Sequence, residues 1–144
     1  MTTIHDLDVG RDGRPLPSQT STNRPFWEAT KEHRLVLQWC TECDRAIFFP
    51  RDNCPLCLSS ALEWRPATGH GLVASVTVET SSPNPTIAGG APYAVALIDL
   101  DEGVRMMTNV VGCPPGDVTV GLPVQVTWVP LSDGRNLPQF EPRS

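Results

Sequence analysis

Four cysteines in two closely spaced pairs constrain the fold of this chain more than any other feature of its sequence. The first pair is Cys40-Thr-Glu-Cys43, and the second pair, ten residues later, is Cys54-Pro-Leu-Cys57. Two Cys-x-x-Cys turns at this separation direct four thiolates at one ion, as in structural zinc sites with Zn–S distances of ~2.3 Å. The spacing therefore predicts that Cys40, Cys43, Cys54 and Cys57 bind Zn²⁺.

Two alternatives compete with zinc, namely a pair of disulfides and a redox dithiol. Four thiols are more than a thioredoxin-like site uses, and residues 1–10 carry no basic-then-apolar export signal. We therefore expect a cytoplasmic protein, where thiols stay reduced. A site closed by four thiolates leaves no position for water or substrate, so its expected role is structural.

The residues around the cysteines predict a small zinc ribbon. Three short β-rich segments, 35–39, 47–49 and 62–64, surround the two cysteine pairs. Residues 50–53, which begin with proline and end with asparagine, are expected to turn the chain back between the pairs. The second segment is expected to form its strand from Ile47, Phe48 and Phe49.

A short helix is predicted just before the ribbon. Asn23 can cap this helix, and Pro25 is acceptable in its first turn, where no intrahelical N–H bond is lost. We expect the helix to run from residue 24 to about 32 or 34. Its neighbouring aromatic residues, Phe26 and Trp27, have two interpretations: both pack inside the protein, or one faces a partner.

From residue 69 onward the sequence predicts a small β-barrel. Several β-rich segments alternate with turn signals and show no helical periodicity, which is typical of a five-stranded OB-fold. Asp101-Glu-Gly103 is expected to form a tight hairpin turn, and 138–142 a short tail. The clear strand segments are 72–80, 93–100, 104–111 and 124–129.

The whole chain is thus predicted to be mostly β, with an N-terminal helix and a zinc ribbon followed by a small OB-fold barrel. We expect an extended arm over 1–22, the helix and ribbon over 23–67, and the barrel over 68–144. Fifteen prolines among 144 residues favour short strands and ordered loops over long helices. By composition the arm is either a disordered tail or a segment that orders against a partner subunit.

Seven short motifs together resemble the family catalogued as domain of unknown function 35, over about residues 24–142. The cysteine pairs alone are common to many ribbons, but their combination with the hairpin from Tyr93 to Arg105 is more specific. One departure is that Asp44 and Leu58 follow the cysteine pairs, where the family often has glycine, so we expect the second turn to close differently. The motifs are Cys40-x-x-Cys43, Phe49-Pro50-Arg51, Cys54-Pro55-x-Cys57, Gly69-x-Gly71, Pro92-Tyr93-x-Val95-Ala96, Asp101-Glu102-Gly103-Val104-Arg105 and Gly121-x-Pro123-Val124.

This resemblance implies a rubredoxin-like zinc ribbon joined to an OB-fold, in a non-catalytic accessory subunit. Family members pair with thiolase-like enzymes or hotdog-fold enoyl-CoA hydratases, including systems that process steroid side-chain, aromatic or fatty acyl-CoA substrates. The resemblance also implies that the ribbon and helix dock the partner, while the barrel face contacts acyl-CoA.

Candidate contacts to acyl-CoA come from two places in the sequence. Arg51 can pair with phosphate, and its alternative is ordinary surface charge. The loop 81–92 contains Gly89 and Gly90, which allow close backbone approach, and it precedes Tyr93. This loop corresponds to a common ligand site of OB-folds, and its alternative is a plain Pro-rich linker.

Two other functions compete with the accessory-subunit hypothesis. Ribbons and OB-folds also bind nucleic acid, but the chain has 11 Lys and Arg against 16 Asp and Glu, and a net charge of −5 opposes phosphate binding. An autonomous thiol enzyme would use the fifth cysteine, Cys113, yet no motif places His5, His33 or His70 beside it. Membrane association is not expected, because no apolar run approaches the ~20 residues that span a bilayer.

Overall fold

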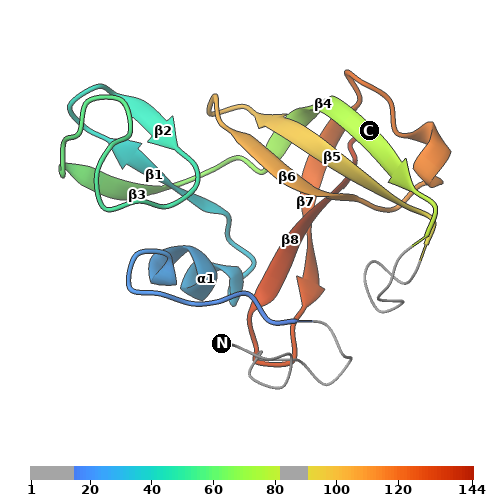
Figure 1. Cartoon of the computed structure of the whole chain (residues 1–144), viewed down its shortest axis with the longest axis horizontal. Coiled ribbons are helices and arrows are strands. Elements are labelled where there is room, and N and C mark those ends of the chain that lie inside the picture. The colour runs from blue at the N-terminus through green and yellow to red at the C-terminus, as the bar shows by residue number, and fades with distance from the viewer. Residues whose placement is uncertain (1–14, 82–90) are drawn as a thin grey trace.

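The computed structural model describes residues 15–81 and 91–144, which form one α-helix, a three-stranded ribbon sheet and a five-stranded barrel. Figure 1 shows the ribbon sheet beside the barrel, with helix α1 (Arg24–Thr30) next to both. This architecture confirms the predicted fold class. Within these residues, no helix combines the length and the apolar character that crossing a bilayer requires.

The ribbon sheet is built around β1 (Val36–Cys40), with antiparallel neighbours β2 (Arg45–Ile47) and β3 (Leu62–Pro66). The prediction that a strand continues through Phe48 and Phe49 is wrong, because β2 ends at Ile47. Beyond Ile47, the buried side chain of Gln38, and not a strand backbone, forms hydrogen bonds with this segment. Its Oε1 accepts a hydrogen bond from the Arg51 N–H at 2.7 Å, and its Nε2 donates to the Arg51 carbonyl at 2.8 Å.

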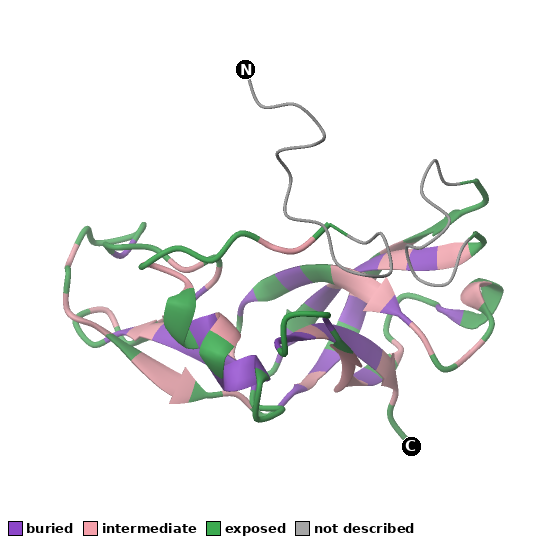
Figure 2. Ribbon diagram, turned by 90° about the horizontal axis from the view of Figure 1, so that it is seen from below, coloured by how far each residue is buried: buried purple, intermediate pink, exposed green. Residues whose placement is uncertain are grey.

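The barrel closes in the order β4-β5-β6-β8-β7, with β6 and β8 parallel and the other neighbours antiparallel. Its strands are β4 (His70–Glu79), β5 (Tyr93–Leu100), β6 (Arg105–Val110), β7 (Pro123–Pro130) and β8 (Asn136–Pro142). Buried residues alternate with more exposed ones along strands such as β5, as Figure 2 illustrates. The predicted hairpin turn is present: Gly103 has a φ of 88° and its N–H donates to the Leu100 carbonyl.

The segment predicted to be a C-terminal tail is in fact a barrel strand. β8 pairs with β7 over seven residues, from Asn136 to Pro142, and its Phe140 is fully buried in the core. Two prolines in β8 weaken the strand signal of this segment in the sequence, because proline cannot donate a ladder hydrogen bond. β8 tolerates the two prolines because its edge toward β6 forms only one registered pair, which joins Val110 to Phe140.

Helix α1 begins at Arg24 as predicted, but it is shorter than predicted and the Asn23 side chain does not cap it. It ends at Thr30, and His33, with a φ of 56°, reverses the chain direction soon afterwards. The Asn23 side chain makes no capping hydrogen bond to the helix. It faces the preceding segment instead, where its Oδ1 accepts from the Thr20 N–H at 2.7 Å and its Nδ2 donates to the Ser18 carbonyl at 3.1 Å.

One hydrophobic core joins the helix, the ribbon and the barrel. Phe26 of α1 and Leu37 of β1 belong to the same buried cluster as Phe140 of β8. Trp27 is partly buried and packs against that cluster, so both members of the aromatic pair lie against the protein interior. Ribbon and barrel are therefore joined by shared packing as well as by the short connection from β3 to β4.

Candidate functional site

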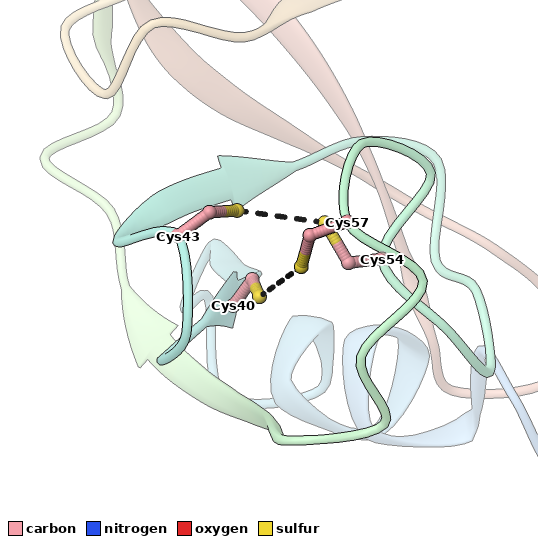
Figure 3. Close-up of side chains that lie close together, drawn as sticks. All are labelled: Cys40, Cys43, Cys54 and Cys57. Atoms are coloured by element: carbon pink, nitrogen blue, oxygen red, sulfur yellow. Dashed lines mark hydrogen bonds between the residues drawn. The ribbon is translucent and has the colours of Figure 1, made fainter.

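The four cysteines of the two pairs converge at one end of the ribbon sheet (Figure 3). Their sulfur atoms all lie within 4.8 Å of one another, and the Cys40–Cys57 and Cys43–Cys54 sulfur distances are both 3.6 Å. A disulfide needs about 2.05 Å. A tetrahedral four-thiolate zinc site with Zn–S bonds of ~2.3 Å has sulfur–sulfur edges of about 3.8 Å. The geometry thus fits a zinc ion and does not fit disulfides.

The residues that follow the two cysteine pairs share one backbone conformation. Asp44 and Leu58, the residues after each pair, have φ values of 54° and 65°. The expectation that Leu58 forces a different second turn is wrong, because leucine adopts the left-handed conformation that glycine commonly provides. In the second turn the Leu58 N–H donates to the Cys54 carbonyl at 2.9 Å.

Backbone groups in the second turn also act on its sulfurs. The N–H of Cys57, with that of Leu56 adding to it, lowers the pKa of the Cys54 thiol to about 6 against the opposing effect of burial. Desolvation raises the pKa of the Cys43 thiol to about 12. The two thiols therefore differ in acidity, and a divalent cation would supply the charge that deprotonates all four.

A second feature is an apolar groove at the junction of the helix, the ribbon and the barrel, which we call the seam groove. It consists of two adjoining hollows of about 310 Å³ and 280 Å³, which share Met107, Leu137 and Pro138. None of the described residues that line it carries a charged side chain. Its walls include Phe26, Trp27, Phe49, Tyr93, Met107 and Leu137.

The candidate acyl-CoA residues do not come together as one site. Tyr93 lines the seam groove. Arg51 lies exposed on the ribbon loop and is not among the residues that line the groove. Gly89 and Gly90 lie outside the described residues. The groove itself was missed in the sequence because its walls come from α1, the β2–β3 loop, β6 and β8, and no local motif links these segments.

Cys113 is partly buried and packs against the core cluster. Of the two histidines that the structure describes, His33 stacks on Trp128 with ring centroids 5.8 Å apart. His70 contacts Arg143, with 2.9 Å between Nδ1 and Nη1. Neither histidine is hydrogen-bonded to Cys113, and His5 lies outside the described residues.

Comparison with known proteins covers both parts of the fold. Residues 27–63 match the family described as "ChsH2, rubredoxin-like zinc ribbon domain", and residues 64–129 match "ChsH2, C-terminal OB-fold domain". A solved structure described as "Ltp2-ChsH2(DUF35) aldolase" is similar with a TM-score of 0.79 and 37% identity. The similarity covers 88% of this chain and 98% of that chain.

Two relatives define the relationship further. The chain is 37% identical over 129 residues to a "Probable enoyl-CoA hydratase alpha subunit" of Thermomonospora curvata, covering 90% of this chain. It spans only about 40% of the length of the hydratase alpha subunits that it matches. It is 32% identical to a "DUF35 domain-containing scaffold protein" of Methanocaldococcus jannaschii, covering 71% of this chain and 73% of that protein. On this similarity, with zinc ribbon and OB-fold both matched, the chain belongs to the DUF35 family.

Proposed function

We propose that this protein is a non-catalytic accessory subunit that binds a thiolase-like or enoyl-CoA-hydratase-like enzyme and positions its acyl-CoA substrate. The observation that carries the proposal is the similarity, over 88% of this chain, to the solved structure described as "Ltp2-ChsH2(DUF35) aldolase". The relatives named as hydratase alpha subunits and as scaffold proteins support the same class of function.

In this proposal Cys40, Cys43, Cys54 and Cys57 hold a structural Zn²⁺. The ion would cross-link the two turns. Four thiolates leave it no open coordination position, so its role is to stabilise the ribbon and not to take part in catalysis. Support comes from the 3.6 Å sulfur distances and from the burial of Cys40 and Cys54.

The contribution to the reaction is then assembly and positioning. The partner supplies the reacting groups, and this subunit orients the acyl group, which accelerates a reaction through proximity and geometry. Tyr93 in the seam groove is the described residue that we expect nearest to the acyl end, with Arg51, Gly89 and Gly90 as further expected contacts. A nucleic-acid module would need a cationic groove with stacking platforms, whereas the described lining of the seam groove is uncharged.

Affinity purification of the tagged chain from its native cells tests the proposal, with co-purifying proteins identified by mass spectrometry. We expect a thiolase-like or hydratase-like subunit in a fixed ratio to the tagged chain, and acyl-CoA turnover by the recovered complex. Recovery of nucleic acid without such an enzyme, or of the chain alone, would contradict the proposal.

A further inference from the structure

The two strands that close the barrel are paired at only one point. β6 and β8 share the registered pair of Val110 with Phe140, and there the Val111 N–H donates to the Phe140 carbonyl at 2.8 Å. Within these two described strands no earlier pair forms. The hollow of about 280 Å³ lies there instead, lined by residues 107–109 of β6 and 137–139 of β8. The ladder between β6 and β8 is therefore open along most of β6.

The backbone of β6 presents alternate residues to its two neighbours. In an antiparallel pair, positions that bond to the neighbouring strand alternate with positions that do not. The Leu100 N–H donates to the Val104 carbonyl at 2.9 Å, so the even-numbered residues of β6 bond to β5. Arg105 and Met107 therefore turn their N–H and C=O groups away from β5. These groups face the same side as the Val111 N–H, which reaches β8.

Met107 thus has a backbone N–H and a backbone C=O that no described strand pairs. Natural proteins usually block such an edge with a charged side chain, a proline or a bulge. β8 has Pro138 on the facing edge, two residues before Phe140. At Met107 none of these devices is present, and the side chain is 68% exposed. The edge of β6 at Met107 is therefore open to a further strand.

These backbone groups select the kind of occupant. An acyl chain is hydrocarbon, so it cannot hydrogen-bond to the N–H and C=O of Met107. An extended peptide repeats both groups every two residues, about 6.8 Å apart, and pairs with open strand edges in this way. The pantetheine arm of CoA also carries amides, but it is attached to phosphates. Phosphates need cations, which the described lining lacks.

The position of the edge argues against a second copy of this chain as the occupant. The edge lies in the seam groove, whose other walls come from α1, the ribbon loop and β8. Two identical edges that are both recessed cannot come within the ~4.8 Å that neighbouring strands require. A terminal or protruding segment of a different protein can enter the groove.

We propose that an extended segment of the partner enzyme adds a strand to the edge of β6, with its backbone hydrogen-bonded to Met107. This inference rests on the proposed function, because the segment belongs to the acyl-CoA enzyme. Tyr93, which we expect near the acyl end, lies toward the opposite end of β6, since its neighbour Ala94 is registered with Val110. The added strand and the acyl group thus use different ends of the groove.

Amide hydrogen exchange, resolved by NMR, tests the inference on the purified chain and on its complex with the enzyme subunit that co-purifies with it. In the free chain the Met107 amide should exchange at least about 10-fold faster than the Thr108 amide, which faces β5. In the complex the Met107 amide should exchange at least about 10-fold more slowly than in the free chain.

Calorimetric titration of variants with the same enzyme subunit tests the bond directly. Met107→Pro removes the N–H that faces the seam and no hydrogen bond to β5, and an edge position tolerates proline. We expect it to weaken binding by about 10-fold or more. Met107→Ala is the matched control, because it keeps the N–H, and it should weaken binding by less than about 3-fold. Unchanged zinc content and circular dichroism establish that Met107→Pro is folded; if it is not, the exchange measurement decides.

The outcomes separate the inference from the proposed function. If the wild type captures no acyl-CoA enzyme, the proposed function fails and the inference fails with it. If the Met107 amide exchanges as fast in the complex as in the free chain, the docking site is wrong and the proposed function stands. Protection of this amide by acyl-CoA alone would make pantetheine the occupant. Protection in a dimer of this chain would make a second copy the occupant, and either result overturns the inference.

Discussion

At the residue scale, Leu58 combines two unfavourable properties. Its φ of 65° is a conformation that costs an ordinary L-residue about 1–2 kcal/mol, and its side chain is 76% exposed. Asp44 occupies the same position in the first turn, but its Oδ1 accepts a hydrogen bond from the Trp39 Nε1–H at 2.9 Å. Both turns thus need a residue in the left-handed conformation. Asp44 offsets the cost of this conformation with a side-chain hydrogen bond, which the apolar side chain of Leu58 cannot form.

We predict that Leu58→Gly stabilises the protein by about 0.5–1 kcal/mol, since relief of backbone strain exceeds the entropy that glycine adds to the unfolded chain. Denaturant unfolding with zinc in excess measures the change. Asp44→Gly is the matched control, and it should give no gain because it removes the hydrogen bond to Trp39. Destabilisation by Leu58→Gly would show that the exposed leucine packs within the chain.

The cysteine cluster supports a second prediction at this scale. Cys54→Ser should bind less than one tenth of the zinc that the wild type binds, because a hydroxyl replaces a fully buried thiolate ligand. Structural zinc contributes ~10–16 kcal/mol to small folded units, so we expect at least the ribbon to unfold. Elemental analysis and circular dichroism measure both effects. Cys113→Ser should keep full zinc content, and full retention in Cys54→Ser would refute the ligand assignment.

At the scale of the elements, local sequence predicts a strand or turn where its signal is strong, and it fails where tertiary contacts decide the secondary structure. The cysteine spacing, the turn at Gly103 and the β-branched run of β4 predicted their elements well. β8 was missed because its prolines suppress the strand signal, while its place in the barrel is decided by the pairing with β7 and by the burial of Phe140. Its strand structure is a property of the closed barrel and not of its local sequence.

The contact between α1 and β8 gives a prediction for these elements. Thr30 is fully buried, and its hydroxyl receives the Asn136 N–H. Thr30→Val keeps the shape of the side chain but leaves that N–H without its acceptor, which costs about 1–3 kcal/mol. Thr77→Val, at an exposed threonine of β4, should change the unfolding free energy by less than about 0.5 kcal/mol. Equal effects of both substitutions would mean that this hydrogen bond does not hold the helix in place.

At the scale of the whole molecule, the ribbon and the barrel are coupled through a shared core, while the cysteines belong to a separate small cluster with Ile47. Phe26, Leu35 and Leu37 lie outside the barrel, yet they belong to the cluster that fills it. The seam groove also belongs to the whole molecule, because the residues that line it are distant in sequence and come together only when the ribbon packs on the barrel. This is why the sequence predicted that the four cysteines converge but did not predict the groove.

Removal of zinc by a chelator should therefore destabilise the barrel as well as the ribbon. Loss of three buried apolar side chains, each worth about 1.5–3 kcal/mol, predicts a fall of about 3 kcal/mol or more in the unfolding free energy of the barrel. Thermal unfolding followed by circular dichroism, with and without the chelator, measures it. A barrel that melts at the same temperature in both states would indicate that the two parts are independent.

The most direct test of the accessory-subunit account is acyl-CoA turnover by the purified partner enzyme, measured with and without this chain. The account predicts turnover by the complex, none by this chain alone, and a rate at least about 10-fold lower for the partner alone, because positioning is lost. Turnover by this chain alone, or an unchanged rate for the partner without it, would contradict the account.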